Sequence, residues 1–145
     1  MNRIVRPLTP QDGEALFKIE ETLFSMPWSK QEFEALTGRD YCHYLVAEVD
    51  GTPVGCVGMT LLCGEADVDK VMVQKEFQGQ GICQELFRKL FELGESLGVE
   101  AYTLEVRCSN APAIHVYEKF GFVGEGIRPR FYEKPVEDAL IMWKR

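Results

Sequence analysis

A short glycine-bearing segment is the first part of the sequence whose residue types could do chemistry. It reads Gln78-Gly79-Gln80-Gly81-Ile82-Cys83 and lies between a strand-like run and a helix-like run. Such a loop presents successive backbone N–H groups to an anion, and the positive end of the following helix dipole adds to the attraction. Its spacing is not that of a triphosphate loop or of the dinucleotide fingerprint. The segment therefore predicts a phosphate or pyrophosphate site, or else a tight turn with positive φ at Gly79 or Gly81 that binds nothing.

A second constellation combines two titratable side chains. Glu105 lies in a strand-like run, and Tyr117 follows within Asn110-Ala111-Pro112-Ala113-Ile114-His115-Val116-Tyr117-Glu118-Lys119-Phe120-Gly121-Phe122. A carboxylate can take a proton from a nucleophile, and a phenol can return one to a leaving group. Taken singly, Glu105 is most simply a solvent-facing strand residue and Tyr117 a core aromatic. Their combination with the glycine segment favours catalytic roles for both.

The secondary-structure elements that hold these residues can be predicted from local signals. Thr9-Pro10-Gln11-Asp12 and Ser29-Lys30-Gln31-Glu32 are helix-start signals, and the second is a capping box. Alternation, helical spacing of apolar residues and turn pairs such as Asp50-Gly51 mark the other elements. We predict helices after both start signals and over residues 82–97 and 112–120, and strands over residues 3–6, 45–49, 54–59, 66–73, 102–106, 122–127 and 139–143. The fold class is mixed α/β.

The composition is that of a folded globular domain. Of the 145 residues, 46% are hydrophobic and 27% charged, and no stretch approaches the roughly 20 apolar residues of a membrane span. No repeat or linker divides the chain, so we expect a single domain over residues 1–145. The first residues contain no apolar leader. We therefore expect a cytoplasmic protein that does not bind membranes.

Charge and cysteine usage narrow the class of partner. A net charge of −7 argues against direct nucleic-acid binding, which needs clustered Lys and Arg, and it suits a cationic partner or serves only solubility. The acids Glu20, Glu21, Glu34 and Asp40 could attract a basic peptide, but we interpret most of them as solvated. Five cysteines without Cys-x-x-Cys spacing predict reduced thiols and no metal site. We interpret the neighbours Cys42 and His43 as strand residues.

The order of the two motifs resembles that of the GNAT superfamily of acetyl-CoA-dependent N-acetyltransferases. Residues 78–83 fit Gln-x-x-Gly-x-small, and residues 110–122 fit Asn-x-x-Ala-x-x-x-Tyr-x-x-x-Gly-Phe. The resemblance implies a GNAT fold of α+β type, with a mixed, mostly antiparallel sheet of about seven strands flanked by about four helices. It also implies acetyl-CoA as co-substrate and an amine as acceptor.

Within that superfamily the chain is most similar to RimI-type enzymes, which acetylate the N-terminal alanine of a small-subunit ribosomal protein. Residues 27–29, 104–110 and 137–142 carry this similarity. The resemblance implies that Glu105 is the general base and Tyr117 the general acid. By the same resemblance, the cofactor-binding residues are Val71, Met72 and Val73 for the pantetheine arm and thioester, Gln78, Gly79, Gln80, Gly81, Ile82, Cys83 and Gln84 around the pyrophosphate, and Asn110 for the cofactor arm.

Elementary acid–base chemistry agrees with these roles. An amine must lose a proton to attack a thioester, and an α-amine with a pKa of about 8 is neutral far more often near pH 7 than a lysine with a pKa of about 10.4. Tyrosine, with an ordinary pKa near 10, is close in acidity to the departing thiol. A backbone N–H near Met72 or Val73 would stabilise the oxyanion on the family pattern.

Two departures from the family pattern concern the cofactor loop and the acceptor site. Cys83 replaces the usual Gly or Ala, and residues 130–136 are shorter than in RimI-type relatives and lack their glycine turn. Tyr132 in that stretch could line the acceptor pocket or be an ordinary aromatic. The leading prediction is a monomeric or weakly dimeric enzyme that acetylates a basic ribosomal protein. The alternatives are another peptide, a lysine or a small amine as acceptor, or a non-catalytic acetyl-CoA sensor.

Overall fold

The computed structural model describes residues 2–145. Within that range the seven strands are β1 (Arg3–Pro7), β2 (Cys42–Val49), β3 (Thr52–Leu62), β4 (Glu65–Val73), β5 (Ala101–Arg107), β6 (Val123–Tyr132) and β7 (Glu137–Lys144). The four α-helices are α1 (Gly13–Leu23), α2 (Lys30–Ala35), α3 (Ile82–Ser96) and α4 (Ala111–Lys119). Short 3₁₀ helices are η1 (Pro10–Asp12), η2 (Leu36–Gly38) and η3 (Lys75–Phe77). The predicted mixed α/β class is confirmed.

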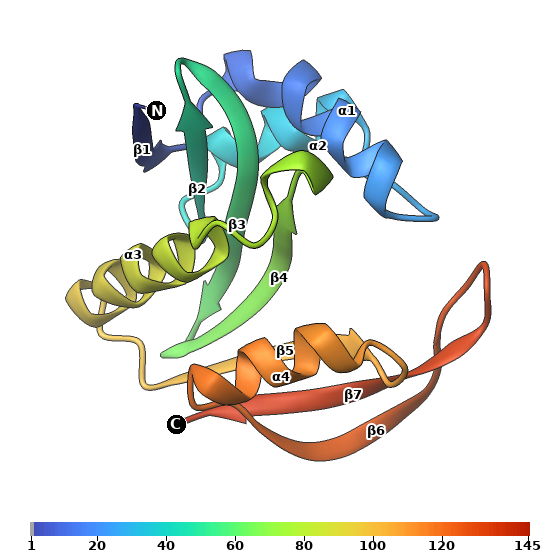
Figure 1. The fold of residues 1–145 in the computed structure, drawn as a ribbon. Helices are drawn as coiled ribbons and strands as arrows, with labels where there is room; N and C mark the ends of the chain where they lie inside the picture. Colours follow the sequence, from blue (N-terminus) through green and yellow to red (C-terminus); the bar gives the residue numbers. More distant parts are fainter. Residues whose placement is uncertain (1) are drawn as a thin grey trace.

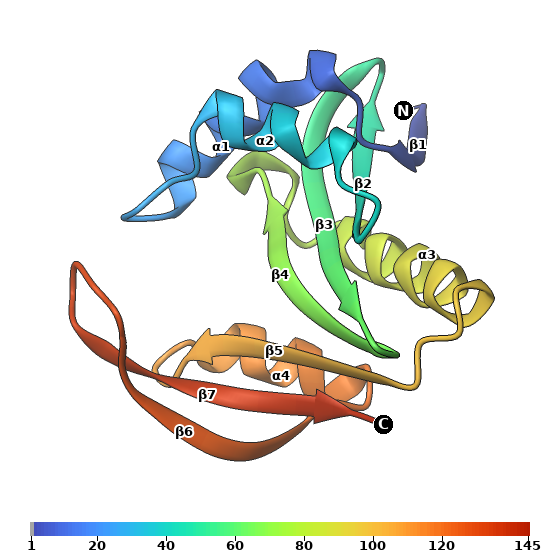
Figure 2. The same cartoon turned by 180° about the vertical axis from the view of Figure 1, so that it is seen from behind.

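All seven strands belong to one sheet in the order β1-β2-β3-β4-β5-β7-β6. Every neighbouring pair is antiparallel except β4 with β5, which is parallel. The parallel pair needs a crossover, and α3 supplies it between the two strands. The helices lie in two layers, with α1 and α2 on one face of the sheet and α3 and α4 on the other (Figures 1 and 2).

Each face of the sheet has its own hydrophobic cluster. Leu86, Phe87 and Leu90 of α3 pack with the apolar side chains of the central strands, and α4 adds Ile114 and Tyr117 to this larger cluster. The smaller cluster lies under α1 and α2 and includes Leu16, Ile19, Phe33, Tyr44, Val46, Cys56 and Met72. Helices therefore cover both faces of the sheet, and each face contributes to a separate hydrophobic cluster.

The sheet opens between β4 and β5. These strands pair only at Glu65 with Ala101, Ala66 with Tyr102 and Asp67 with Thr103. Beyond these positions they diverge, and Figure 1 shows β5, β6 and β7 turning away from the end of β4. Backbone groups of β4 that face β5 after Asp67 therefore have no partner strand. This V-shaped opening is the place where a ligand can bind main-chain groups.

Most elements lie where local signals predict them. Ser29 and Glu32 exchange the two hydrogen bonds of a capping box at 3.1 and 3.0 Å. Asp50 and Gly51, with φ of 51° and 84°, form the tight turn between β2 and β3. The last hairpin differs, because β6 continues to Tyr132 through an irregular register near Arg130, which has a φ of 52°. Part of the stretch expected as a loop at residues 130–136 is therefore strand.

Candidate active site

The glycine segment lies at the N-terminus of α3, beside the opening. Gly79 and Gly81 have φ of 78° and 82°, as the turn prediction required. No heavy atom lies within 4 Å of a Cβ built on Gly79, and only an Arg3 nitrogen, at 4.0 Å, neighbours one built on Gly81. Gly81 is the N-cap of α3 and supplies no side-chain cap. The loop therefore offers free space and unpaired helix N–H groups, which suit an anion.

A small hollow connects this loop to α4. It has a volume of about 190 Å³ and is lined by Val73, Phe77, Gln78, Gly79, Gly81, Ile82, Cys83, Gln84 and Val116. The structure thus brings most of the predicted loop residues and Val73 together in one place. Gln80 does not line the hollow, and its carbonyl faces the other way, toward Arg3.

Arg3 braces the loop from β1, which sequence reasoning missed. Its Nη1 donates to the carbonyl of Gln80 at 2.8 Å, and its Nε lies 3.0 Å from a carboxylate oxygen of Glu85 in the first turn of α3. One side chain therefore contacts both the loop and the helix that follows it. The contact spans 77 positions in sequence, so no local signal could have revealed it.

Backbone directions along β4 separate the predicted oxyanion donors. The N–H of Gln74 donates to a carbonyl of β3 at 2.7 Å, whereas the carbonyl of Val73 accepts the side-chain N–H of Gln78 at 2.9 Å. Because successive residues of a strand turn their amides to opposite sides, the N–H groups of Val71 and Val73 point into the opening. Met72 turns its amide toward β3. The geometry therefore favours Val73 over Met72 as an oxyanion donor.

Glu105 lies on the face of β5 opposite α4. Its neighbours Leu104 and Val106 are buried in the larger cluster, and alternation along the strand turns Glu105 to the other face. Its side chain is 20% exposed, and Oε2 lies 3.2 Å from an Arg128 nitrogen of β6. Glu105 and Arg128 therefore form an ion pair on the face of the sheet that carries α1 and α2. The sequence did not predict this ion pair.

Tyr117 packs against the larger hydrophobic cluster from α4, and its neighbour Val116, not Tyr117 itself, lines the hollow. Its ring packs against Phe87 and Phe122 with centroid distances of 5.9 and 6.2 Å. Burial raises the pKa of Tyr117 well above its ordinary value, with smaller contributions from Cys83 and Tyr132. Desolvation disfavours the phenolate, so the pKa of this phenol lies further above that of a thiol than the ordinary value suggests. The phenol is therefore protonated at neutral pH.

Tyr132 lies close to both predicted catalytic residues. The Arg107 guanidinium lies 4.5 Å from the centroid of its ring. Burial first, and then the charge of Glu105, raises the pKa of Tyr132 to about 12. Tyr132 in turn contributes to the raised pKa of Tyr117. Tyr132 is therefore near enough to both residues to affect their electrostatics, and a role in the acceptor pocket stays a prediction.

Asn110 has a structural task. Its Oδ1 accepts the N–H of Ala113 at 3.3 Å and caps α4. The predicted contact with a cofactor arm is therefore left to its side-chain NH₂ group. Cys83, the departure from the family pattern, lies in the hollow, where burial raises the pKa of its thiol to about 11.

Two aspartates of β4 were missed by sequence reasoning. Asp69 has no register partner, which marks a β-bulge opposite Gly58 and Met59. Its carboxylate accepts hydrogen bonds from the hydroxyls of Tyr44 and Thr60. Desolvation, with the charges of Asp69 and Glu105, raises the pKa of the nearby Asp67 to about 6, against a smaller opposing effect of Arg128. The alternation in Glu65-Ala66-Asp67-Val68-Asp69 is the sequence signal that could have revealed this acidic face.

Of the four acids that we interpreted as mostly solvated, Glu20 is the exception. Glu20 is 1% exposed and pairs with Lys70, because α1 packs its inner face onto β4. Glu21 and Asp40 are exposed as expected, and Glu34 is partly buried. All five cysteines are free thiols, as predicted.

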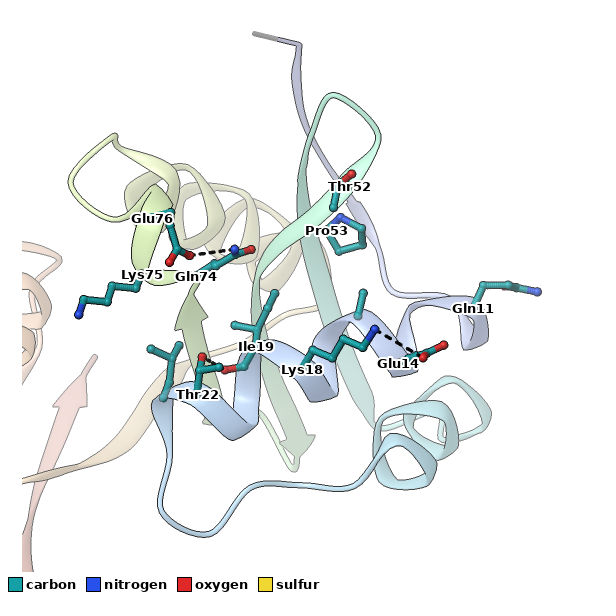
Figure 3. Close-up of a pocket in the computed structure, with 12 residues that line it drawn as sticks. Gln11, Glu14, Lys18, Ile19, Thr22, Thr52, Pro53, Gln74, Lys75 and Glu76 are labelled. Atoms are coloured by element: carbon teal, nitrogen blue, oxygen red, sulfur yellow. Dashed lines mark hydrogen bonds and ion pairs between the residues drawn. The ribbon is translucent and has the colours of Figure 1, made fainter.

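A larger hollow lies away from the predicted catalytic residues. It has a volume of about 720 Å³ and is lined by Gln11, Glu14, Ala15, Lys18, Ile19, Thr22, Leu23, Thr52, Pro53, Gln74, Lys75 and Glu76. Figure 3 shows that the hollow has side chains of α1 on one side and those of the start of β3 and of the segment at Gln74 on the other. Neither Glu105 nor Tyr117 contributes to it, so size alone does not locate the chemistry here.

None of the helices formed by residues 2–145 is long and apolar enough to cross a membrane. The same residues contain no group of three or more His, Cys, Asp or Glu side chains arranged to hold a metal ion.

Known proteins similar to this one match it over most of its length. Residues 13–122 match the family model described as the acetyltransferase (GNAT) family. A Bacillus subtilis protein, described provisionally as a ribosomal protein bS18-alanine N-acetyltransferase, is 38% identical over 140 residues, covering 96% of this chain and 93% of the relative. The ribosomal protein bS18-alanine N-acetyltransferase of Escherichia coli K12 is 31% identical over 140 residues, covering 95% of this chain and 94% of the relative.

Structural similarity agrees with the sequence matches. The crystal structure of the ribosomal-protein-S18-alanine N-acetyltransferase from Escherichia coli superposes with a TM-score of 0.91 at 29% identity, covering 99% of this chain and 93% of that one. The predicted seven-stranded, mostly antiparallel architecture with four helices is thereby confirmed.

Proposed function

The chain belongs to the GNAT family of acetyltransferases, and from this we propose that it transfers the acetyl group of acetyl-CoA to the N-terminal alanine α-amine of a small-subunit ribosomal protein. The observation that carries the choice of acceptor is the 38% identity, over 96% of the chain, to a relative described as a bS18-alanine N-acetyltransferase. The 31% identical Escherichia coli relative carries the same description. A protein N-terminus is thus favoured over a lysine or a small amine.

The cofactor side of the proposed site is the face that carries α3 and α4. Free N–H groups at Gly79, Gly81 and the first turn of α3 suit a pyrophosphate, and the open space at both glycines lets it approach the backbone. Acetyl-CoA supplies the acetyl group as an activated thioester. The N–H groups of Val71 and Val73 point into the opening, where they can hold an extended arm and the thioester carbonyl.

The acceptor side is the opposite face. Glu105 can take the proton of an incoming ammonium directly or through a water, and the amine then attacks across the opening. Tyr117 lies on the other side, where its phenol can donate to the departing sulfur. The high pKa of Tyr117 keeps this proton in place until the sulfur carries negative charge. The opposed placement of base and acid supports direct transfer, without an acetylated protein residue.

The surroundings of Glu105 suit a cationic acceptor. Asp67 and Asp69 share its face of the sheet, and the chain carries a net charge of −7. Opposite charge raises the rate of encounter with a basic protein. We further propose that the whole chain acts as one domain in the cytoplasm, as a monomer or weak dimer, without binding nucleic acid, a membrane or a metal.

Mass spectrometry of two peptides tests the proposal. One begins Ala-Arg with a free α-amine, and the other is blocked at its N-terminus but carries a lysine. After incubation with the protein and acetyl-CoA, we expect one acetyl group on the first peptide and none on the second.

The remaining outcomes discriminate the alternatives. Acetylation of the lysine peptide alone would assign the chain to another acceptor class within the family. If neither peptide gains mass while acetyl-CoA binds in calorimetry, the candidates become a small-amine acetyltransferase or a non-catalytic sensor, and a panel of small amines separates these two.

A further inference from the structure

A buried ion pair joins α1 to β4 close to the segment that links α1 to α2. Lys70 is 7% exposed and Glu20 1% exposed, and the Lys70 Nζ lies 2.7 Å from the Glu20 Oε2. The main-chain N–H of Trp28 donates to the same oxygen at 3.3 Å. The other oxygen, Oε1, is buried without a hydrogen-bond partner among the described residues. The pair therefore lies in a site where water does not screen the charges.

The Lys70 ammonium also contacts two aromatic rings of residues 24–29, which connect α1 to α2. Its Nζ lies 4.0 Å from the centroid of the Trp28 ring and 4.7 Å from that of the Phe24 ring. A cation over an aromatic face is attracted by it, most strongly where water is excluded. One side chain of β4 thus holds two residues of this segment at once.

Residues 24–29 flank the face on which Glu105 lies. They reach toward the turn between β6 and β7 on the same side of the sheet (Figures 1 and 2). The hydroxyl of Ser25 donates to the carbonyl of Glu133 at 3.3 Å and joins the two segments. Phe24 and Met26 are 39% and 53% exposed. The segment therefore presents exposed apolar side chains beside the face from which the proposed acceptor enters.

Stability alone does not explain a buried ion pair here. Removing two charges from water costs free energy that their attraction seldom exceeds, and apolar residues of similar volume are often as stabilising. The surroundings, including Ile19, Cys56 and Met72, would accept such residues. The ion pair instead fixes the geometry of its neighbours. The ammonium contacts the Glu20 carboxylate and two aromatic rings, and the carboxylate accepts the main-chain N–H of Trp28.

We propose that Lys70 and Glu20 are positioning residues for the acceptor. The pair holds Phe24 and Trp28 so that residues 24–29 form a preformed wall against which the first residues of the acceptor dock. The proposal rests on the proposed function, since it assumes that the amine enters from this face. A preformed wall lowers the ordering cost of binding and leaves the chemical step unchanged. The pair therefore acts on the KM for the acceptor.

The test is the double variant Lys70→Met with Glu20→Gln. Methionine keeps the length of the lysine and contacts aromatic rings favourably, and glutamine can still accept the N–H of Trp28. With the free-alanine peptide, we expect the acceptor KM to rise about tenfold or more, while kcat stays within about threefold. The dissociation constant of acetyl-CoA, measured by calorimetry, should stay within about twofold. A merely structural role would not separate these constants.

The matched control removes a second ion pair of the same helix layer. Arg6 and Asp12 lie 2.8 Å apart near the start of α1, away from residues 24–29. In Arg6→Met with Asp12→Asn, we expect lower thermal stability and an unchanged acceptor KM. An equal rise of the acceptor KM in control and test variants would overturn the proposal.

Two further results would also overturn it. One is an acceptor KM within about twofold of the unaltered value in a test variant that binds acetyl-CoA normally. If the test variant does not fold, Phe24→Ala removes a ring contact from an exposed side chain, and an unchanged acceptor KM there excludes the proposal as well. Failure of the proposed function would be seen separately, in the unaltered protein. The ratio of the acceptor KM in each variant to that in the unaltered protein can then be measured with whichever amine the unaltered protein acetylates.

Discussion

The proposed base already has a partner in the absence of an acceptor. The Arg128 guanidinium lies 3.2 Å from the Glu105 carboxylate, and the arginine side chain is 56% exposed on the edge strand β6. An exposed arginine changes rotamer at small cost, because such ion pairs contribute little free energy. The ammonium of an acceptor can therefore take the place of Arg128 beside Glu105 and leave a pair already suited to proton transfer.

Replacing Glu105 with glutamine tests that role. Since a positioned base contributes roughly 10²–10⁴-fold, we expect Glu105→Gln to lower kcat for the alanine peptide by about that factor. Binding of acetyl-CoA, measured by calorimetry, should not change. Glu125→Gln is the matched control, because Glu125 also pairs with an arginine, Arg145, but at the far end of β6. A rate and pH profile equal to those of the unaltered protein would exclude Glu105 as base.

The raised pKa of Asp67 makes the free energy of unfolding depend on pH. Its folded pKa of about 6 lies above the ordinary value of 3.8, so the folded state favours the protonated acid. The stability that this group contributes is complete below pH 3.8 and is lost as the pH rises through about 6. Asp67→Asn should therefore raise the melting temperature at pH 8, by about 1–3 °C given the exposure of the residue, and have no effect at pH 3.5.

Scanning calorimetry at both pH values checks this expectation. Glu65→Gln is the control, because Glu65 is an exposed acid on the same face of the same strand. A melting temperature that falls at pH 8 in Asp67→Asn would mean that the neighbouring charge of Arg128 outweighs the repulsion from Asp69 and Glu105.

Among the elements, β1 has a task beyond closing the edge of the sheet. It carries Arg3, whose guanidinium contacts both the glycine loop and the first turn of α3. The loop has two residues with positive φ and no regular hydrogen-bond ladder, so such an external contact restricts its shape. The arrangement of the N–H groups in the proposed anion site therefore depends on a strand that lies far from the loop in sequence.

Arg3→Met is expected to weaken cofactor binding selectively. Loss of the contacts to Gln80 and Glu85 should raise the KM for acetyl-CoA about three- to tenfold, with little change of kcat at saturation, because the chemical step does not involve the loop. Arg88→Met is the control, since Arg88 also lies within 4.0 Å of Glu85 but is exposed on α3. Steady-state kinetics with varied acetyl-CoA measure this KM. An equal KM for acetyl-CoA in the two variants would contradict the prediction.

Local chemistry explains which elements could be predicted from the sequence. The start of α2 and the turn at Asp50 could be predicted because their capping and φ requirements involve neighbouring residues. The Glu20–Lys70 pair could not, because its members are 50 residues apart and meet only when α1 packs on β4. The bulge at Asp69 and the extension of β6 past Arg130 were missed for the same reason, since register depends on the partner strand.

The candidate site divides in the same way. The glycine loop, Glu105 and Tyr117 were predicted from motifs. The structure places the loop after β4, Glu105 on β5 beyond the last β4–β5 register pair, and Tyr117 on α4 against the larger hydrophobic cluster. The raised pKa of Tyr117 and the ion pair of Glu105 with Arg128 could not be predicted, because both arise from tertiary packing.

At the scale of the whole molecule, the proposed sites for the two substrates lie on opposite faces of the sheet. The glycine loop and Tyr117 lie on one face, and Glu105 with residues 24–29 lies on the other. On the proposed mechanism the two substrates occupy the site together, and the acetyl group passes directly from one to the other.

Initial-rate kinetics test this conclusion. When both substrates are varied, we expect intersecting double-reciprocal lines, which indicate a ternary complex. Cys83 is the thiol in the hollow, and its pKa of about 11 keeps thiolate scarce at neutral pH. Cys83→Ala should accordingly keep kcat within about threefold. Parallel lines, or loss of activity in Cys83→Ala, would point instead to an acetylated cysteine.

The short parallel pairing of β4 with β5 also gives the chain a seam. Only three register pairs join the half made of β1 to β4 to the half made of β5 to β7, and the connection after α3 turns at Gly98, which is exposed with a φ of 77°. The halves also share the larger hydrophobic cluster. The chain thus has the architecture of a protein suited to fragment complementation. A ligand lodged in the seam would hold the halves together, so that cofactor affinity and reassembly of the fragments become a single linked equilibrium.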